Sequence, residues 1–298
     1  MRVVVPVVDL RAQPHTIAQR ATHDPLEETQ LLYGEHVQVL AQKDGWSQVE
    51  ATEQPELSHA NRWQGYPGWV PSSALQPLDE ELESNIVVTD KWATTWTNAY
   101  ATAPSQWRFP MGSRLHAVDM AQQMWRIDMA NGDEVWMSYG SAKTLKALRA
   151  LSPADRRRLI VRNAEHALGD PYYWGGRSPQ AQPPSDLITG VDCSGLVNLA
   201  YRTAGVDIPR DAHEQWLRAR RLSTPQVADL IFLSERNNPR RIVHVMLYVG
   251  DGAVIEGPGT GTVVRRISLR ERLGRSLDQL PSGTVIDGQT VSYGSYLP

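Results

Sequence analysis

The stretch GVDCSGLV, residues 190–197, contains the only cysteine of the 298-residue chain, Cys193. Apolar residues recur after it on one helical face, and Gly205 ends this pattern. The pattern predicts a helix that begins at the cysteine, with Asp192 as its cap. Unpaired N–H groups at a helix start favour a thiolate, whereas a free cysteine in a core behaves as a small hydrophobe. From this segment alone, both interpretations of Cys193 stay open: nucleophile and core residue.

A histidine interrupts an otherwise apolar segment downstream, RIVHVMLYVG at residues 241–250. Alternation predicts a strand with Val243 and the later odd-numbered aliphatic residues on one face and His244 on the other. Asp251 and Gly252 predict a hairpin turn into GAVIEG, the strand that carries Glu256. A buried histidine needs a polar partner, and this hairpin brings Glu256 beside it. With the cysteine, these residues supply the nucleophile, base and orienting group that thiol catalysis requires.

The chain from residue 149 to residue 298 is predicted to be one α+β domain, with helices first and antiparallel sheet after. Ser152 and Asp155 have the spacing of a helix-capping pair, and Pro153 suits the first helical position. The apolar stripe of this predicted helix consists of Leu159, Ile160, Ala164 and Leu168.

The tryptophans are concentrated before residue 150, where eight of the ten occur. This half lacks helical periodicity and is predicted to consist of short strands between turns. YGEHVQVLAQKDGWSQV (33–49) and MGSRLHAVDMAQQMWRI (111–127) match as a degenerate repeat of a glycine, two alternating apolar segments and a tryptophan. We therefore predict two small β-barrels, residues 1–78 and 79–148. Tyr66 lies in the predicted loop NRWQGYPGW, where a binding role and a packing role are both open.

Composition excludes several classes of protein. The net charge of −3, with acids and bases mixed, argues against a nucleic-acid surface. One cysteine excludes an intrachain disulfide and any metal site built from several cysteines. No segment approaches the roughly 18 apolar residues of a membrane span, and the N-terminal apolar patch is too short for a signal-peptide core.

Several expectations about the setting of the protein follow from this composition. We expect no metal, no other cofactor and no membrane partner; a monomer is favoured, and the oligomeric state is left open. On the sequence as given we expect a cytoplasmic protein; a location in the cell envelope would follow if a signal peptide had been removed.

Five motifs follow one another along the second half: PYYWGG, VDCSGLV, PRD, HVMLYVG and VIEG. Over about residues 165–270 this set resembles the NlpC-type, papain-like cysteine peptidases of bacterial cell-wall turnover. The tryptophan-rich half resembles bacterial SH3 modules, with GYPGWV as the clearest signature. The resemblance implies a papain-like peptidase domain, built of helices and antiparallel sheet, after two SH3-like barrels.

The resemblance also implies roles for individual residues. Cys193 corresponds to the nucleophile and His244 to the general base, and Glu256 occupies the third position, where His, Asn or Gln is more usual. A carboxylate there stabilises an imidazolium and so favours the thiolate. The Tyr172 hydroxyl would form the oxyanion site with the backbone N–H of Cys193, and Tyr173 is the neighbouring alternative.

The segments that flank the cysteine match residues that bind the amine end of a substrate in this family. Asp192 and Ser194 occupy those positions, although both also suit helix-start caps. Asp211 is predicted to cap the next helix rather than to bind a ligand. Ala212 stands where relatives can carry a substrate-binding serine, so one polar contact is expected to be missing.

The arrangement of two SH3-like modules before this domain resembles that of the γ-D-glutamyl-L-diamino acid endopeptidases, also called dipeptidyl-peptidase VI. Those enzymes cut short murein peptides that bear a free N-terminal L-Ala, so the expected partners are L-Ala-γ-D-Glu-diamino acid peptides. By this resemblance the first module forms one wall of the active-site cleft. Tyr66 would pack on the terminal L-Ala, and Glu28, or alternatively Glu35, would bind its ammonium group. The identity of the diamino acid and the cleavage of intact murein are left open.

Two other classes of function compete with this hypothesis. A murein amidase or an acyltransferase would use the same Cys–His–Glu set on a different bond or acceptor. A non-catalytic wall-binding protein would depend on the SH3-like modules alone, and the ordered set of Cys193, His244 and Glu256 disfavours it.

Overall fold

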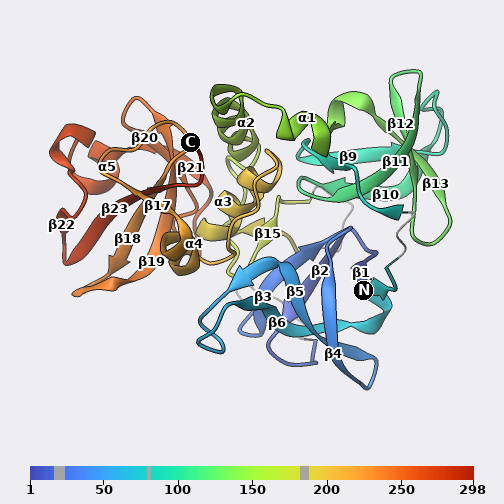
Figure 1. The fold of residues 1–298 in the computed structure, drawn as a ribbon, viewed down its shortest axis with the longest axis horizontal. Coiled ribbons are helices and arrows are strands. Elements are labelled where there is room, and N and C mark those ends of the chain that lie inside the picture. Colours follow the sequence, from blue (N-terminus) through green and yellow to red (C-terminus); the bar gives the residue numbers. More distant parts are fainter. Residues whose placement is uncertain (17–23, 79–81, 182–187) are drawn as a thin grey trace.

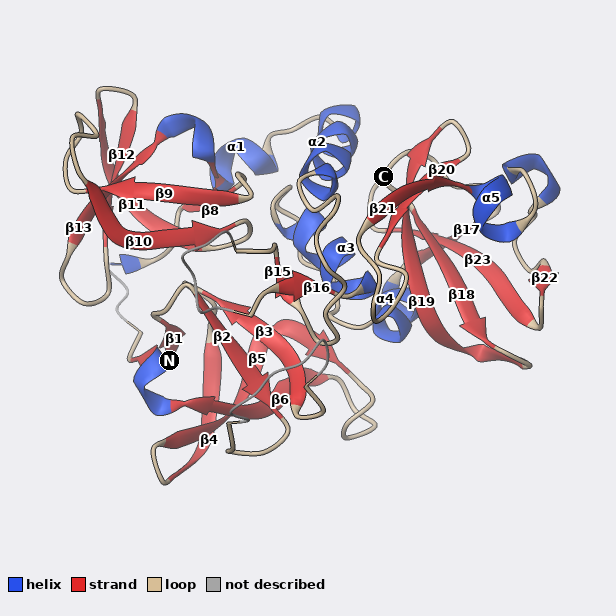
Figure 2. Cartoon of the chain, turned by 180° about the vertical axis from the view of Figure 1, so that it is seen from behind, coloured by secondary structure: helices blue, strands red, loops and turns tan. Residues whose placement is uncertain are grey.

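The computed structural model describes residues 1–16, 24–78, 82–181 and 188–298. Two β-rich modules precede a larger domain of helices and antiparallel sheet (Figure 1). Helices α2 (Pro153–Glu165) and α3 (Cys193–Arg202) lie between the large sheet and the two modules, as both views show (Figure 2). The predicted fold class, with β modules first and an α+β domain after them, is confirmed.

The first module is an antiparallel sheet with the strand order β3-β2-β6-β5-β4, together with the short pair β1-β7. Its strands are β1 (Arg2–Val3), β2 (Val7–Arg11), β3 (Glu27–Leu32), β4 (Val37–Lys43), β5 (Trp46–Glu56), β6 (Gln64–Pro71) and β7 (Leu75–Gln76). A 3₁₀ turn, η1 (Ser72–Ala74), joins the last two strands. Both sheets contribute side chains to one apolar core, which includes Val3, Leu10 and Tyr66.

The second module is a sheet with the order β10-β9-β13-β12-β11-β8-β14. Its strands are β8 (Ile86–Val88), β9 (Trp92–Trp96), β10 (Pro104–Pro110), β11 (Arg114–Ala121), β12 (Met124–Asp128), β13 (Glu134–Ser138) and β14 (Ala142–Thr144). The turn η3 (Tyr139–Ser141) precedes β14, and the short helix α1 (Leu145–Arg149) follows it. The domain boundaries at 78/79 and 148/149 stay predictions, and residues 79–81 lie outside the described residues.

The degenerate repeat corresponds to two equivalent hairpins, β4–β5 and β11–β12. Each hairpin turns through two residues in the left-handed region, at positions 44–45 in one module and 122–123 in the other. Such turns match the twist of the paired strands. Similar sequence thus gives similar local structure in the two modules.

The helices of the third part begin where the sequence predicts. The Ser152 hydroxyl accepts from the Asp155 N–H at 3.1 Å and caps α2. Leu159, Ile160 and Ala164 are buried, but Leu168 is exposed because the helix ends before it and the chain turns at Gly169. The remaining helices are α4 (Ala212–Arg218), α5 (Leu269–Leu273) and the turn η4 (Leu277–Gln279).

The large sheet has the order β17-β23-β18-β19-β20-β21, and β22 pairs with β23. Its strands are β17 (Arg220–Leu222), β18 (Leu230–Glu235), β19 (Asn238–Gly250), β20 (Ala253–Glu256), β21 (Arg265–Ser268), β22 (Val285–Ile286) and β23 (Gln289–Ser295). The short pair β15 (Arg177–Ser178) and β16 (Gly190–Val191) leads into α3.

The prediction that Val243 lies on the same face of β19 as the later odd-numbered aliphatic residues is wrong. This side chain is 48% exposed, and Ile242 takes its expected place in the core against α3. The cause is a register shift against β18, because Leu233 pairs with His244 while Ser234 pairs with Ile242. The bulge leaves one residue of β19 unpaired and reverses the alternation before the histidine.

The largest core continues across all three parts of the molecule. It joins α2, α3 and the sheet to Val7 and Leu32 of the first module and to Val87 and Met111 of the second. Among the described residues, no helix combines the length and the apolar character needed to cross a membrane.

Candidate active site

Cys193 is the first residue of α3 and lines a cleft, while its inner side contacts the main core. It is 9% exposed. Asp192 caps the helix, because its Oδ1 accepts from the Gly195 N–H at 2.6 Å. The two roles left open from the sequence are therefore compatible in this position, since the cysteine is packed on one side and faces the cleft on the other.

His244 on β19 lies between the cysteine and Glu256. Its Nε2 is 2.7 Å from Glu256 Oε2, which leaves Nδ1 for the hydrogen bond with the Cys193 thiol. Burial lowers the pKa of His244, but the hydrogen bonds to Cys193 and Glu256 outweigh burial and raise this pKa to about 9. The structure thus brings together the three predicted groups in the order thiol, imidazole, carboxylate.

Glu256 on β20 is fully buried and is held by two arginines in addition to the histidine. Arg265 reaches its Oε1 through Nη2 at 2.7 Å and Nε at 3.1 Å. The Nε of Arg272 lies 2.9 and 3.0 Å from the two carboxylate oxygens. Burial raises the pKa of Glu256, but the hydrogen bond to His244 and the two arginines lower it to about 2. The carboxylate is therefore ionised in spite of its burial.

Tyr172 lines the cleft beside the cysteine, whereas Tyr173 does not. A bridge between Tyr172 and Val191 fixes the backbone of this segment next to the start of α3. Burial and the nearby charges of Asp192 and Cys193 raise the pKa of Tyr172, so its hydroxyl keeps its proton. A protonated hydroxyl can donate to a developing oxyanion, and the oxyanion role of Tyr172 stays a prediction.

The cleft has a volume of about 320 Å³ and is bounded by two parts of the molecule. The larger domain contributes the start of α3, the start of α4 and the segment 241–243. The first module contributes Glu28, Ser58, His59 and Tyr66.

One end of this cleft is acidic. The Tyr66 hydroxyl donates to Asp211 Oδ2 at 3.0 Å and so joins the first module to the start of α4. Asp211 stands at the cap position of α4, but its side chain makes no capping hydrogen bond, so the predicted capping role is wrong. Burial raises the pKa of Asp211 to about 6, although adjacent Arg210 opposes this shift. Since it lines the cleft, Asp211 is a candidate ligand that the sequence did not identify.

Glu28, predicted to bind an ammonium group, also lines the acidic end. Its Oε2 lies 3.5 Å from Nε2 of His59, a residue that the sequence did not single out. The hydrogen bond to Glu28 and the neighbouring Glu56 overcome burial and raise the pKa of His59 to about 9. Glu28 thus lies in the cleft beside His59, and its contact with a substrate ammonium group stays a prediction.

Asp192 and Ser194 line the cleft too, but their polar atoms already have protein partners. The two carboxylate oxygens of Asp192 accept from Arg210, Oδ1 at 3.0 Å and Oδ2 at 2.7 Å. The Ser194 hydroxyl donates to Asp192 at 3.1 Å and accepts from Arg210 at 2.9 Å. Their predicted contact with a substrate amine stays a prediction.

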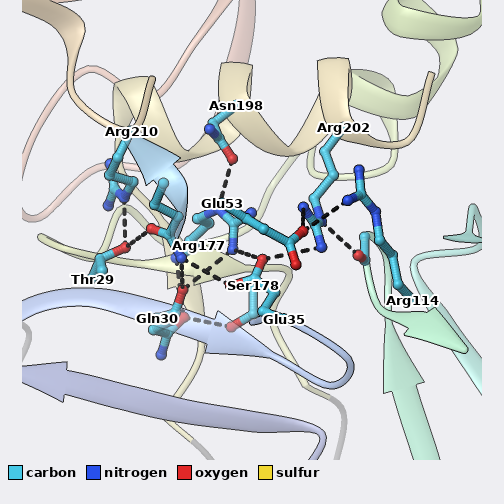
Figure 3. Close-up of polar contacts among 12 residues, drawn as sticks. Thr29, Gln30, Glu35, Glu53, Arg114, Arg177, Ser178, Asn198, Arg202 and Arg210 are labelled. Carbon is cyan, nitrogen blue, oxygen red and sulfur yellow. Dashed lines mark hydrogen bonds and ion pairs between the residues drawn. The ribbon is translucent and has the colours of Figure 1, made fainter. Parts of the chain in front are cut away.

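Three buried arginines of the larger domain join it to the first module: Arg177, Arg202 and Arg210 (Figure 3). Arg210 donates through Nε to Thr29 Oγ1 at 2.7 Å. Arg177 pairs through Nη1 with Glu35 Oε1 at 2.7 Å, and its N–H donates to the Gln30 side chain at 3.0 Å. Charges this deeply buried are stable only when paired, so these contacts fix the first module against α3.

The second module enters the same network through Arg114 (Figure 3). Arg114 and Arg202 both donate to Glu53 Oε2 at 2.8 Å, and Arg114 also forms a two-point ion pair with Asp207. Arg202 Nε donates to the carbonyl oxygen of Gly112 at 2.9 Å. All three parts of the molecule therefore meet at Arg202.

Glu35, the alternative residue for the ammonium contact, lies elsewhere than predicted. It is fully buried in the network with Arg177 and accepts from Gln54 at 3.0 Å. It does not line the cleft. The reason is local, because Glu35 follows the turn at Gly34 and points into the contact between the modules and the larger domain.

Comparison with known proteins agrees with this architecture. Residues 169–276 match the NlpC/P60 family, and residues 10–54 match the bacterial dipeptidyl-peptidase Sh3 domain. A solved NlpC/P60 family protein from Bacillus cereus superimposes with a TM-score of 0.76 at 23% identity, covering 100% of this chain and 99% of that one. That likeness extends over both modules and the peptidase-like domain.

Two curated relatives are named gamma-D-glutamyl-L-lysine dipeptidyl-peptidase. The protein from Bacillus cereus is 27% identical over 81% of this chain and 70% of its own length. The protein from Bacillus subtilis is 25% identical over 84% of this chain and 78% of its own length. The chain therefore carries an NlpC/P60 domain, preceded by a bacterial dipeptidyl-peptidase Sh3 domain.

Proposed function

We propose that this protein is a cysteine peptidase that hydrolyses the γ-D-Glu–diamino acid bond of murein peptides with a free N-terminal L-Ala. Cys193 attacks the carbonyl carbon, and His244 takes the thiol proton and returns it to the leaving amine. The Tyr172 hydroxyl and the Cys193 N–H donate to the oxyanion of the tetrahedral intermediate. Water then hydrolyses the acyl-enzyme with the same histidine as base.

The observation that carries this proposal is the acidic end of the cleft. Glu28 and Asp211 lie there, from two different parts of the molecule, and Tyr66 of the first module donates to Asp211. Carboxylates in a partly desolvated cleft favour an ammonium group, because charge-assisted hydrogen bonds are stronger than neutral ones. A peptide with a free amine brings a positive charge to them, whereas an N-acylated peptide leaves Glu28 only its pair with His59 and Asp211 only its protein partners.

The contact between the first module and the larger domain supports a closed cleft rather than a tethered arm. Arg177 and Arg210 pair with residues of the first module at fully buried positions. Opening this contact would break these charge pairs and expose the apolar core that the two parts share. The Tyr66 wall is thereby kept beside Cys193, and intact murein, whose L-Ala nitrogen is amide-bound, is excluded.

Product analysis tests which bond is cut. L-Ala-γ-D-Glu-diaminopimelate and the corresponding lysine peptide are incubated with the protein, and the products are identified by mass spectrometry. We expect the dipeptide L-Ala-γ-D-Glu and the free diamino acid from at least one of the two. Release of free L-Ala, or transfer of the acyl group to an added amine without hydrolysis, would contradict the proposal.

A further inference from the structure

The carboxylate of Glu256 is surrounded by more positive charge than its pairing with His244 requires. Arg265 lies directly across from it in the β20–β21 pair, and Arg272 reaches it from α5. The carboxylate accepts five hydrogen bonds, of which four come from the two arginines. A contact set this dense fixes both the position and the plane of the carboxylate.

The two oxygens of Glu256 have different partners. Oε1 accepts from Arg265 and Arg272, while Oε2 faces His244 at 2.7 Å and also accepts from Arg272 at 3.0 Å. Rotation of the carboxylate would break contacts with both arginines. The direction of the His244 ring therefore depends on groups that the ring does not touch.

The arginines also change the charge that His244 experiences. Without the arginines, a buried carboxylate at 2.7 Å would raise the pKa of the imidazolium further, and an imidazolium with a higher pKa is a poorer proton donor to a leaving amine. Two guanidinium groups beside the carboxylate offset its negative charge. The groups that face this site from the surrounding elements are Cys193 on α3, Arg265 on β21, Arg272 on α5, and Arg236 and Asp287 in the cavity next to Arg272.

We propose that Arg265 and Arg272 are positioning residues that act through Glu256: they hold its carboxylate against His244 and offset its charge. The imidazole is thereby oriented, and the imidazolium that pairs with the Cys193 thiolate can still give its proton to the leaving amine. This inference rests on the proposed function for the role of His244 in catalysis. Its consequences for the titration of His244 do not depend on any substrate.

An unusual pattern of substitutions follows. Glu256→Gln keeps the shape of the side chain but leaves two guanidinium groups facing the imidazole, so the pKa of His244 should fall by about one unit or more. Arg272→Gln removes one positive charge and should raise this pKa by about half a unit. The double variant Glu256→Gln/Arg272→Gln should lie closer to wild type than Glu256→Gln alone. Arg272→Gln therefore moves the pKa of His244 away from its wild-type value when Glu256 is present, and back toward that value when Glu256 is replaced by glutamine.

Two measurements test this pattern without a peptide substrate. The ring protons of His244 are titrated by NMR and identified among the eight histidines by their absence in His244→Asn. The rate of alkylation of Cys193, the only cysteine, is followed by mass spectrometry at pH 7. We expect Glu256→Gln to be alkylated about tenfold more slowly than wild type, and the double variant to recover at least a third of the loss on a logarithmic scale.

Matched controls are available on the same two elements. Arg270 lies on α5 and Arg266 on β21, and neither contacts Glu256. Arg270→Gln and Arg266→Gln remove the same charge and should shift the pKa of His244 by less than about 0.2 units, because exposed charges are screened. Arg272→Lys keeps the charge and loses the guanidinium plane, so it should leave this pKa near wild type while slowing alkylation. Thermal unfolding of each variant verifies that the fold persists.

The inference is overturned if the folded double variant is alkylated no faster than Glu256→Gln. It is equally overturned if Arg272→Gln shifts the His244 titration no more than Arg270→Gln does. Should the protein fail to cut murein peptides, the proposed function is contradicted, whereas the titration and alkylation results still decide the role of the arginines.

Discussion

Cys193 combines three features that act on one sulfur atom: a capped helix start, a hydrogen bond to a buried histidine and an open side toward the cleft. The N–H groups of the helix start and a protonated histidine both favour the thiolate. An ordinary core cysteine would have neither the histidine nor the cleft. The position therefore supports a nucleophile more strongly than the sequence segment alone.

Cys193→Ala should lower kcat/KM by at least about a thousandfold, because no other group on the described part of the chain replaces the nucleophile. The substitution is small and should cost about 1 kcal/mol of stability or less. Peptide cleavage and thermal unfolding measure the two quantities. Full activity in the folded variant would contradict the mechanism.

We expect Asp211 to make binding of a free amine depend on pH. Its pKa is raised to about 6, so the carboxylate is charged above this pH and neutral below it. The KM for a peptide with a free amine should therefore increase as the pH falls through about 6. Asp211→Asn should raise KM by about tenfold at pH 7.5 and remove this dependence, since a neutral amide makes a weaker hydrogen bond to ammonium.

Asp251→Asn is the matched control for this substitution. Asp251 lies in the β19–β20 turn, where asparagine tolerates the left-handed backbone, and it does not line the cleft. Its KM profile should equal that of the wild type. If Asp211→Asn also behaves as the wild type, Asp211 does not contact the amine.

At the scale of elements, the start of α3 is fixed by close contact with the loop before β15. A Cβ at Gly195 would lie 2.2 Å from the carbonyl oxygen of Gly176 and 3.0 Å from Asp192 Oδ1. The first of these contacts is with backbone, which cannot move aside without shifting the loop. Glycine at this position therefore keeps the thiol, its cap and the Tyr172 segment in register.

Gly195→Ala should displace the helix start, destabilise the protein by about 2 kcal/mol or more and lower kcat more than KM. Gly140→Ala serves as the control, because a Cβ there would meet only Ser138 Oγ at 3.8 Å, an ordinary contact. Thermal unfolding and initial rates on the two variants check both expectations. Equal stability and equal kcat in the two variants would show that the contact at Gly176 is not restrictive.

The elements that were predictable are those whose signals are local. Asp251 and Gly252 specify the hairpin by their own conformations, with φ of 52° and 68°, and Ser152 caps its own helix. The bulge at Val243 was not predictable, because it depends on the pairing of β19 with β18. The contact between Arg272 and Glu256 was missed for a related reason: sixteen positions along the chain and the strand β21 separate them. Asp211 resembled a helix cap, and only the packing of the first module revealed Tyr66 as its partner.

The whole molecule is organised around the buried network that joins its three parts. Glu35 of the first module is the carboxylate that faces both Arg177 and Arg202. Because the modules and the larger domain also share a continuous apolar core, we expect them to unfold together.

Glu35→Gln should lower the free energy of unfolding by about 3–5 kcal/mol, since it leaves a buried arginine without its charge partner. Glu134→Gln is the matched control on the surface of the second module. Its pair with Arg126 is exposed to solvent, so its loss should leave the free energy of unfolding almost unchanged. Denaturant unfolding followed by tryptophan fluorescence and circular dichroism gives both values. Equal, small losses of unfolding free energy in Glu35→Gln and Glu134→Gln would mean that Glu35 does not hold the modules together.

The most direct measurement compares free and N-acetylated L-Ala-γ-D-Glu-diaminopimelate as substrates of the wild type and of Tyr66→Ala. An acetylated peptide leaves Glu28 and Asp211 without the ammonium group and adds bulk against Tyr66, at a cost of a few kcal/mol. We predict that the wild type cuts the free peptide with a kcat/KM at least about a hundredfold higher, and that Tyr66→Ala narrows this ratio. Equal rates on the two peptides, or cleavage of intact sacculi as fast as of the free peptide, would contradict a cleft closed by the first module.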